Sequence, residues 1–305
     1  MQKIVVPKSF NEGRLDLFLV KELSKSRNYI SKLFKLHLIK VNDEPVKKPG
    51  HLLQPNDKIS VGDLSTPDKN SRKPIKHEVQ VIFEDQDIIV INKPKNIIAH
   101  PTSFNEKDTI VNIFSNKIKV EEFVDQSRPG IVHRLDRNTT GLMVIARNKK
   151  AYDSLTEQIN KKILIRKYLV LVHGTFKDEA LIIKAPIKRS RQNLLKMVVS
   201  DEPSAKLAVT EIKLIANYKD SALIECKLLT GRTHQIRAHL AYIHHYVFND
   251  EMYGHADGYA NYEQFLHAHY LSFIHPTTHK QLEFHSEPDA TFLRLQSKLK
   301  RGNNV

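Results

Sequence analysis

The spacing of hydrophobic positions near the N-terminus predicts two helices followed by short strands. Apolar residues recur at helical intervals over residues 14–23 and again over residues 28–39, where lysines are interleaved with them. Residues 41–46 and 50–61 combine apolar residues with Asn, Asp and Pro, which is typical of strands joined by turns. We therefore expect a small α/β unit in the first 62 residues.

Beyond residue 78 the pattern changes to a succession of strands with a few helices. Residues 79–94 alternate and then become continuously apolar around an acidic turn, as two short strands would. Further strands are predicted over residues 142–146, 163–174, 180–187, 206–215 and 221–229. Helices are predicted over residues 108–118 and 149–162, and after a turn within residues 229–244. This order predicts an α+β fold with a central, mostly antiparallel mixed sheet and flanking helices.

The stretch between these two regions has the composition of a linker. Residues 63–78 are polar, contain two prolines and have few apolar side chains. We therefore predict a small basic domain over residues 1–62, a linker over residues 63–78 and a larger domain over residues 79–305.

The charge balance indicates a polyanionic partner. The 305 residues include 48 Lys and Arg against 34 Asp and Glu, which gives a formal net charge of +14. Residues 13–62 alone hold 10 basic and 5 acidic side chains. An excess of this size favours nucleic acid as the partner, with an anionic membrane surface as the second choice.

Other bulk features predict a protein of the reducing cytoplasm. No apolar run approaches the roughly 20 residues of a membrane span, so no spanning segment is expected. With nucleic acid as the favoured polyanion, no membrane partner is predicted. The N-terminal residues lack the apolar core and cleavage site of a signal peptide. The single cysteine, Cys226, cannot form an internal disulfide and stands in a strand-like run, which indicates a buried thiol.

Residues 130–148, GIVHRLDRNTTGLMVIARN, combine candidate chemistry with a core strand. Asp136 stands between Arg134 and Arg137, just before a Thr-Thr-Gly turn and an apolar run. A structural ion pair that fixes the loop would explain this pattern. So would a catalytic nucleophile or base that neighbouring cations keep ionised. Glycosidases usually need two carboxylates, and no second acidic residue lies nearby in the sequence, so a catalytic interpretation favours one carboxylate without metal or cofactor.

The basic first region carries an ordered set of short patterns. It has an Arg-Leu-Asp start, a Ser-Arg step before the second helix, and the ending V-N-x-x-x-V-K-K-P followed by L-x-x-x-D-x-I-x-V. In these features it resembles the small RNA-binding domain first seen in ribosomal protein S-four. The resemblance implies phosphate contacts by five residues: Arg14, Ser26, Arg27, Lys32 and Lys47. Such contacts give affinity and salt dependence with little base discrimination; a solvated charged surface is the alternative.

Five motifs follow one another through residues 79–292. They are KPKNIIAHP (93–101), HRLDRNTTGL (133–142), RKYLVLVHG (166–174), LLTGRTHQIRAHL (228–240) and FLHAHYLSFIHP (265–276). In order and separation they resemble the RluA family of pseudouridine synthases. The resemblance implies that the chain isomerises uridine to pseudouridine in structured RNA without cofactor or metal. The appended RNA-binding domain favours large-subunit (23S-type) ribosomal RNA over transfer RNA.

The resemblance also implies roles for single residues. Asp136 would be the catalytic aspartate and Arg237 its salt-bridge partner, while Tyr168 would lie against the target base. Arg134 would fill the space left by a flipped-out uridine. His133 is expected to serve the loop rather than the chemistry. Whether the aspartate attacks the ribose, attacks the base or takes a sugar proton stays open.

Two features depart from the family pattern. Thr140 replaces the usual serine, and residues 244–254 read HHYVFNDEMYG where the family has G-x-P-I-x-G-D-x-x-Y-G. Asp250, Tyr253 and Gly254 are retained, but the shape of this loop is in question. Separately, residues 231–290 hold 10 of the 16 histidines. With no cysteine among these histidines and no H-E-x-x-H pattern, no metal site is expected.

Two other functions remain compatible with the sequence. A non-catalytic RNA-binding factor for ribosome assembly could keep the same fold, although the retained Asp136, Tyr168 and Arg237 disfavour it. An RNA glycosidase that stops after bond cleavage is the second alternative, and it would release free uracil. Protein partners and the oligomeric state are not predicted.

Overall fold

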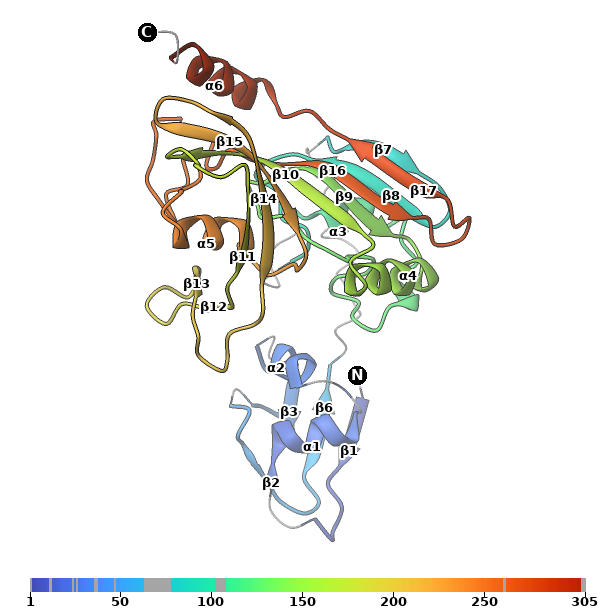
Figure 1. The fold of residues 1–305 in the computed structure, drawn as a ribbon. Coiled ribbons are helices and arrows are strands. Elements are labelled where there is room, and N and C mark those ends of the chain that lie inside the picture. The colour runs from blue at the N-terminus through green and yellow to red at the C-terminus, as the bar shows by residue number, and fades with distance from the viewer. Residues whose placement is uncertain are drawn as a thin grey trace. The chain divides into compact units, whose positions relative to one another are not determined.

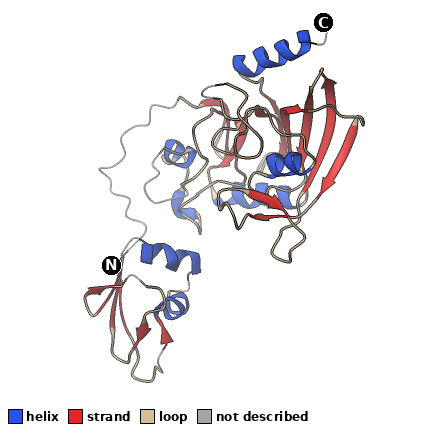
Figure 2. Ribbon diagram, turned by 90° about the vertical axis from the view of Figure 1, so that its left-hand side faces the viewer, coloured by secondary structure: helices blue, strands red, loops and turns tan. Residues whose placement is uncertain are grey.

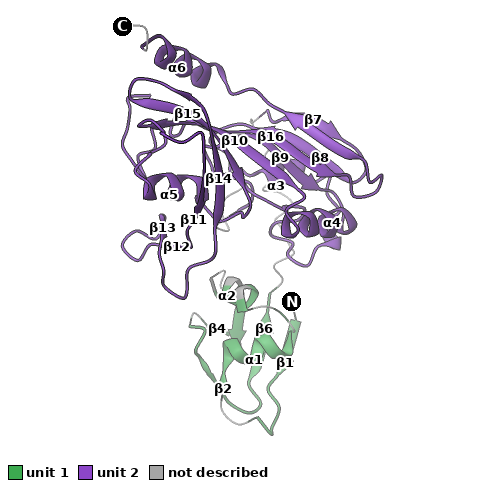
Figure 3. Ribbon diagram, in the orientation of Figure 1, with its two compact units in different colours: residues 1–74 green, residues 75–305 purple. Residues whose placement is uncertain are grey.

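In this computed structural model the described residues are 2–10, 13–23, 25, 27–35, 38–46, 48–62, 78–101, 108–259 and 262–302, without the side chains of Asn28, Lys32 and Lys35. The chain divides into two compact units, Met1–Pro74 and Ile75–Val305 (Figure 3). The predicted linker, apart from its last residue, lies outside the described residues. Among the described helices, none is long and apolar enough to cross a membrane.

Unit 1 packs two helices on a small antiparallel sheet (Figure 1). The helices are α1 (Leu15–Glu22) and α2 (Arg27–Lys35). The sheet runs in the order β1 (Gln2–Val5), β6 (Lys58–Val61), β3 (Ile39–Val41) and β4 (Glu44–Pro45), and β2 (Gly13–Arg14) pairs separately with β5 (Leu52–Leu53). Leu15 and Leu19, one turn apart on α1, are fully buried and contribute to a core of this unit alone.

Unit 2 is built on one nine-stranded sheet (Figures 1 and 2). Its order is β11 (Ala180–Lys184), β14 (Val209–Asn217), β15 (Ser221–Leu228), β10 (Ile165–His173), β16 (Leu266–Ile274), β9 (Thr140–Ala146), β8 (Ile88–Lys93) and β7 (Gln80–Glu84), with β17 (Gln281–His285) also paired to β16. All of these pairs are antiparallel except β9 with β16. The α+β prediction with a mostly antiparallel mixed sheet is confirmed.

Strand β9 is buried on both faces, which explains its unbroken apolar run. Met143 and Ile145 face a core shared with α3 (Ile110–Phe114) and α5 (Gln235–Tyr242). Leu142 and Val144 face the opposite core, which includes α4 (Lys149–Asn160). Because side chains alternate along a strand, one short segment joins both layers to the sheet.

The remaining elements are a two-stranded hairpin, a C-terminal helix and a short 3₁₀ turn. The hairpin consists of β12 (Ile187–Arg189) and β13 (Met197–Val199), outside the large sheet. Helix α6 (Ala290–Arg301) begins at Asp289, whose carboxylate accepts the backbone N–H groups of Thr291 and Phe292. A short 3₁₀ turn covers Val120–Glu122.

Two groups of elements differ from the sequence-based expectation. The second helix, predicted to reach residue 39, ends at Lys35, because Ile39 and Val41 pair with β6 and are buried in the sheet. The hydrophobic pattern also does not predict β1, β12, β13, β16, β17 or α6. Of these, β16 is defined by partners on both edges, a tertiary feature that its own residues do not show.

Candidate active site

The loop before β9 holds Asp136 at a fixed place beside the core. Leu135 is buried in that core, and the backbone N–H of Thr139 donates to the carbonyl of Asp136 at 3.2 Å. His133 is buried and its Nε2 accepts the backbone N–H of Val144 at 3.2 Å. Burial, with the nearby Arg166 charge, lowers the pKa of His133 to about 3, so the ring is neutral. It supports the loop, as the sequence predicts.

Lys93 also stabilises the loop that holds Asp136, through hydrogen bonds to backbone carbonyls. Its ammonium is fully buried and donates to the carbonyls of Pro94, Ile97 and Arg137 at 2.8, 2.9 and 3.0 Å. Three acceptors match the three protons of an ammonium group. Burial lowers the pKa of Lys93 to about 7, although the Asp136 charge opposes that shift. The bond to Arg137 fixes the backbone directly after the aspartate.

The start of β9 touches β16 closely enough to require glycine. Gly141 has φ +111°, and a Cβ there would lie 2.3 Å from the carbonyl oxygen of Ala268. On the neighbouring residue, Oγ1 of Thr140 lies 2.7 Å from Nδ1 of the buried His267. The Thr-Gly pair therefore allows the single parallel contact of the sheet, which holds the Asp136 loop against β16.

Arg237 of α5 joins two carboxylates. Its Nε and Nη2 donate to Oδ2 and Oδ1 of Asp250 at 2.6 and 2.7 Å, a bidentate pair. Its Nη1 donates to Oδ2 of Asp136 at 3.2 Å. Arg237 and Asp136 are therefore neighbours, as expected. The sequence shows no second acidic residue near Asp136, but in the structure Asp250 lies on the other side of Arg237. Asp250 lies in the loop whose shape the sequence left in question.

The electrostatics of this cluster favour charged partners. Burial alone lowers the pKa of Arg237, but the hydrogen bonds and charge of Asp250, together with the charge of Asp136, raise it above its ordinary value. The guanidinium also lies 4.9 Å from the ring centre of Tyr253, within cation–π distance. The guanidinium of Arg237 is thus permanently charged. Its Nη1, the nitrogen that does not bind Asp250, faces Asp136.

Tyr168 lies on the same face of the sheet as α5. It sits in β10 between Cys226 of β15 and Ala268 of β16, and it is buried. Burial raises the pKa of its hydroxyl to about 12, with the Asp136 charge adding to the rise and the Arg166 charge opposing it. The hydroxyl therefore keeps its proton at neutral pH and can donate a hydrogen bond.

His234 is a neighbour of Asp136 that the sequence interpretation missed. It has φ +52° just before α5, and its Nε2 lies 3.9 Å from Oδ2 of Asp136. Its Nδ1 lies 3.1 Å from the hydroxyl of Tyr253, which in turn accepts the backbone N–H of Met197 at 2.8 Å. Burial lowers the pKa of His234 despite the Asp136 charge. His234 stands within one of the five motifs, but nothing in its spacing identifies this contact.

The side chains around Asp136 line a small pocket. Its cavity is about 40 Å³, and its walls are Arg134, Leu135, Asp136, Thr139, Tyr168, Leu228, Arg232, His234, Gln235, Ile236, Arg237 and Leu266. All four residues predicted for chemistry or base flipping are among them. Arg134 is exposed, whereas Tyr168 and Arg237 are buried. The cavity is small, with about the volume of one water molecule in the liquid, and it is open to solvent.

A larger basic groove adjoins this pocket through Arg232. The groove has a volume of about 520 Å³ and is lined by Ile187, Lys188, Arg189, Arg191, Met197, Ser204, Lys206, Gly231, Arg232 and Thr233. Five of its ten lining residues are Lys or Arg. Glu202 pairs with Lys188 and Arg191, which leaves a net positive surface. The sequence interpretation did not single out this groove, because its residues come from three separate segments.

The predicted phosphate contacts of unit 1 are only partly visible. Arg14 is exposed and donates two hydrogen bonds to Asp16, at 3.0 and 2.9 Å, and Arg27 is exposed at the start of α2. Ser26, Lys47 and the side chain of Lys32 lie outside the described residues. Within the described residues, two groups of side chains could hold a metal ion, and neither includes Asp136.

Comparisons with known proteins cover both units. The family model described as RNA pseudouridylate synthase matches residues 87–242, and the S4 domain model matches residues 13–59. A Mycoplasma pneumoniae protein named uncharacterized RNA pseudouridine synthase is 37% identical over 92% of this chain and 90% of its own. The ribosomal large subunit pseudouridine synthase D of Zymomonas mobilis is 35% identical over 79% of each chain.

The fold agrees with these matches. The structure of human RNA pseudouridylate synthase domain containing 4 has a TM-score of 0.56 and 22% identity, covering 72% of this chain and 93% of that one. The resemblance inferred from the five motifs is confirmed, and with it an isomerase that acts on RNA. This chain therefore belongs to the RNA pseudouridylate synthase family, in its RluA branch, and carries an S4 domain at its N-terminal end.

Proposed function

We propose that the enzyme isomerises a uridine of large-subunit ribosomal RNA and that Asp136 is its catalytic carboxylate. The reaction breaks the glycosidic bond of the uridine, turns the base and rejoins it to the ribose through carbon. The observation that carries the proposal is the position of Asp136 in the wall of a pocket, 3.2 Å from a nitrogen of Arg237. Its side chain is 16% exposed, which leaves one side open to a substrate.

The surroundings suit a carboxylate that must act while ionised. Attack on the ribose, attack on the base and removal of a sugar proton all require the charged form of Asp136. Arg237 supplies a permanent positive charge, and Asp250 holds two nitrogens of that guanidinium. Among the described residues, the hydrogen bond from Arg237 is the one that orients the Asp136 carboxylate, and it leaves other oxygen lone pairs for a substrate.

Tyr168 and Arg134 are assigned to the target nucleotide. The ring of Tyr168 offers a flat apolar surface to the uracil base. Its protonated hydroxyl can donate a hydrogen bond to a carbonyl oxygen of that base. Arg134 is exposed at the pocket and can occupy the stack that the flipped uridine leaves.

Two surfaces support a large structured RNA as substrate. The basic groove beside the pocket suits a phosphate backbone, and the S4 domain adds a second basic unit. The Zymomonas mobilis relative is named for the large ribosomal subunit. Together these observations favour large-subunit ribosomal RNA over transfer RNA, and a cytoplasmic site of action follows from that substrate.

The first experiment is pseudouridine mapping of total RNA from cells with and without the gene. We expect one or a few large-subunit sites to lose the modification when the gene is removed. Wild-type protein should restore those sites, and Asp136→Asn should not. If sites disappear only from transfer RNA, the assignment of the substrate is wrong while the activity stands.

Purified protein distinguishes the remaining alternatives. Asp136→Asn should abolish turnover and keep RNA affinity, whereas a joint loss of both would make Asp136 a structural residue. Free uracil among the products would identify a glycosidase. If no RNA site changes in the cell, the non-catalytic assembly factor becomes the better explanation.

A further inference from the structure

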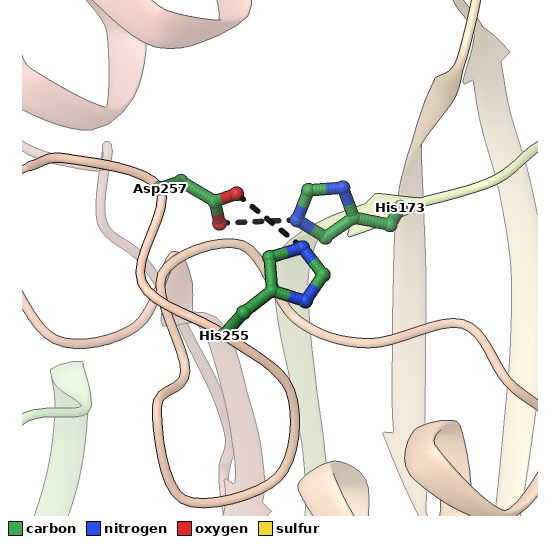
Figure 4. Close-up of side chains that lie close together, drawn as sticks. All are labelled: His173, His255 and Asp257. Carbon is green, nitrogen blue, oxygen red and sulfur yellow. Dashed lines mark hydrogen bonds and ion pairs between the residues drawn. The ribbon is translucent and has the colours of Figure 1, made fainter.

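A second cluster of chemically capable side chains lies outside the active-site pocket. His173 is the last residue of β10, and His255 and Asp257 lie in the loop that follows Gly254. Nε2 of His173 lies 3.0 Å from Oδ2 of Asp257, and Nε2 of His255 lies 3.6 Å from Oδ1 (Figure 4). The three side chains present ligand atoms that all lie within 4.8 Å of one another.

We propose that His173, His255 and Asp257 bind a divalent transition-metal ion of the Zn²⁺ type, with water completing a tetrahedral shell. Two imidazole nitrogens and a carboxylate oxygen form a ligand set of the kind that zinc takes. Bonds of about 2.0–2.1 Å would bring tetrahedral ligand atoms to roughly 3.3 Å from one another. His173 and Asp257 are already within this distance. Because all three ligand atoms lie within 4.8 Å of one another, no pair has to close by more than about 1.5 Å.

Two of the three ligands are already held in place. The carboxylate of Asp257 accepts the backbone N–H of Asn249, and the backbone N–H of Asp257 donates to Oδ1 of Asn249. The His173 ring stacks on Phe248 with ring centres 3.9 Å apart. His255 is 59% exposed, so it is the ligand that closes over the ion.

The second group of metal-compatible side chains, Asp85, Asp87 and His275, contains a histidine that is not available to a metal. Nδ1 of His275 accepts the backbone N–H groups of Thr277 and Thr278 at 3.1 and 3.0 Å. Its proton is therefore on Nε2, which donates to Oδ2 of Asp85 at 2.7 Å. No lone pair remains for an ion. Within the described residues, no backbone N–H donates to a ring nitrogen of His173 or His255.

An ion at this site would tie the end of β10 to the loop that carries Asp250. The backbone N–H of Gly254, the residue before His255, donates to the carbonyl of Asp250 at 2.7 Å. The loop departs from the family pattern in its residues, so an ion could replace the glycine and proline that shape it elsewhere. Metal binding itself does not depend on the proposed role of Asp136.

The test is metal titration of the full-length protein after removal of metals with a chelator. We expect one Zn²⁺ per chain by calorimetry, and with Co²⁺ the visible absorption of a four-coordinate nitrogen and oxygen site. His255→Gln and Asp257→Asn should each weaken binding by about tenfold or more. Because His255 is exposed, its variant should fold normally. Added Zn²⁺ should raise the Tm of the wild type and raise that of His255→Gln by less at the same concentration.

A matched control separates this site from adventitious histidine binding. His285 is exposed on β17 and belongs to neither metal-compatible group, so His285→Gln should bind Zn²⁺ as the wild type does. The proposal is overturned if the wild type takes up no stoichiometric ion. It is also overturned if His255→Gln and Asp257→Asn bind as tightly as the wild type. Loss of pseudouridine formation in any of these variants has no bearing on either result.

Discussion

Arg237 shows how one guanidinium can bind a buried anchor and the proposed catalytic carboxylate together. Two of its nitrogens are committed to the fully buried Asp250, and the third reaches Asp136. Because the fork is planar, the bidentate contact determines where the third nitrogen points. Asp250 thus fixes the guanidinium that contacts Asp136, and it does not line the pocket itself.

Asp250→Asn should therefore damage both stability and catalysis. It removes the buried charge that balances Arg237, and breaking a buried pair in this way costs about 3–5 kcal/mol. We expect kcat to fall while RNA affinity changes little, measured by urea unfolding, turnover and binding on the same variant. Asp153→Asn is the control, since its pair with Lys149 is exposed and should cost under about 1 kcal/mol. Unchanged turnover would show that Asp136 needs no oriented partner.

Lys93 gives the Asp136 loop a pH dependence of its own. The pKa of Lys93 is about 7 in the folded protein, against an ordinary value of 10.5. Between these values the unfolded chain binds the proton and the folded chain does not, so this group makes stability rise with pH. From pH 7 to pH 9 the gain should be about 2 kcal/mol.

Comparison with Lys93→Met isolates that contribution. Urea unfolding at pH 7 and pH 9 should show the gain in the wild type and a smaller one in the variant, because Met carries no proton. The variant should also lose turnover, since the backbone of Arg137 is released from its donor. An identical pH dependence in both proteins would mean that the ammonium stays charged across this range.

At the scale of elements, the parallel contact between β9 and β16 positions the active-site loop. It joins only two residue pairs, Thr140 with His267 and Gly141 with Ala268. The loop of Asp136 leads directly into this contact, so a shift of β9 along β16 would move the carboxylate. The basic hairpin of β12 and β13 borders the groove on the same side of the sheet as α5.

Gly141→Ala should break the contact. The added Cβ would lie 2.3 Å from a backbone oxygen at a φ of +111°, so we expect at least about 3 kcal/mol of destabilisation and little turnover. Gly258→Ala is the matched control, because Gly258 also has a positive φ, +80°, but a Cβ there would meet no described atom within 4 Å. Equal losses in urea unfolding would attribute the whole effect to backbone strain.

At the scale of the whole molecule, positive charge is present in both units. Unit 1 exposes Arg27 on α2, and unit 2 exposes Lys206 in the basic groove. Each unit has a hydrophobic core of its own. A net charge of +14 suits an RNA that contacts both, and every phosphate contact adds to the salt dependence of binding.

Single charge removals should therefore change the salt slope of RNA binding and leave chemistry intact. Arg27→Ala and Lys206→Ala should each reduce the slope of log K against log salt by about 1, and the double variant by about 2. Lys161→Ala is the control, because Lys161 follows α4 on the other face of the sheet. An additive effect of the two changes would show that both units bind the same RNA; no effect of Arg27→Ala would remove unit 1 from the interface.

The sequence by itself determined the local properties of this protein. Helical spacing identified α1 and α4, and apolar runs identified β8 and β10, because the burial of an element leaves a short-range pattern in its own residues. The ordered motifs identified the family, because they keep particular residues at fixed separations. The excess of basic residues indicated nucleic acid as the partner, because net charge depends on composition alone and not on the fold.

Tertiary structure decided which of these residues meet. Arg237 reaches Asp136 across 101 positions and Asp250 across 13, while His173 meets Asp257 across 84. Tertiary partners also determined that α2 ends at Lys35 and that residues 266–274 form β16, a strand paired on both edges. Such contacts depend on strand register and on how whole layers pack, and these follow from burying the entire chain together. Spacing within one segment carries no information about them.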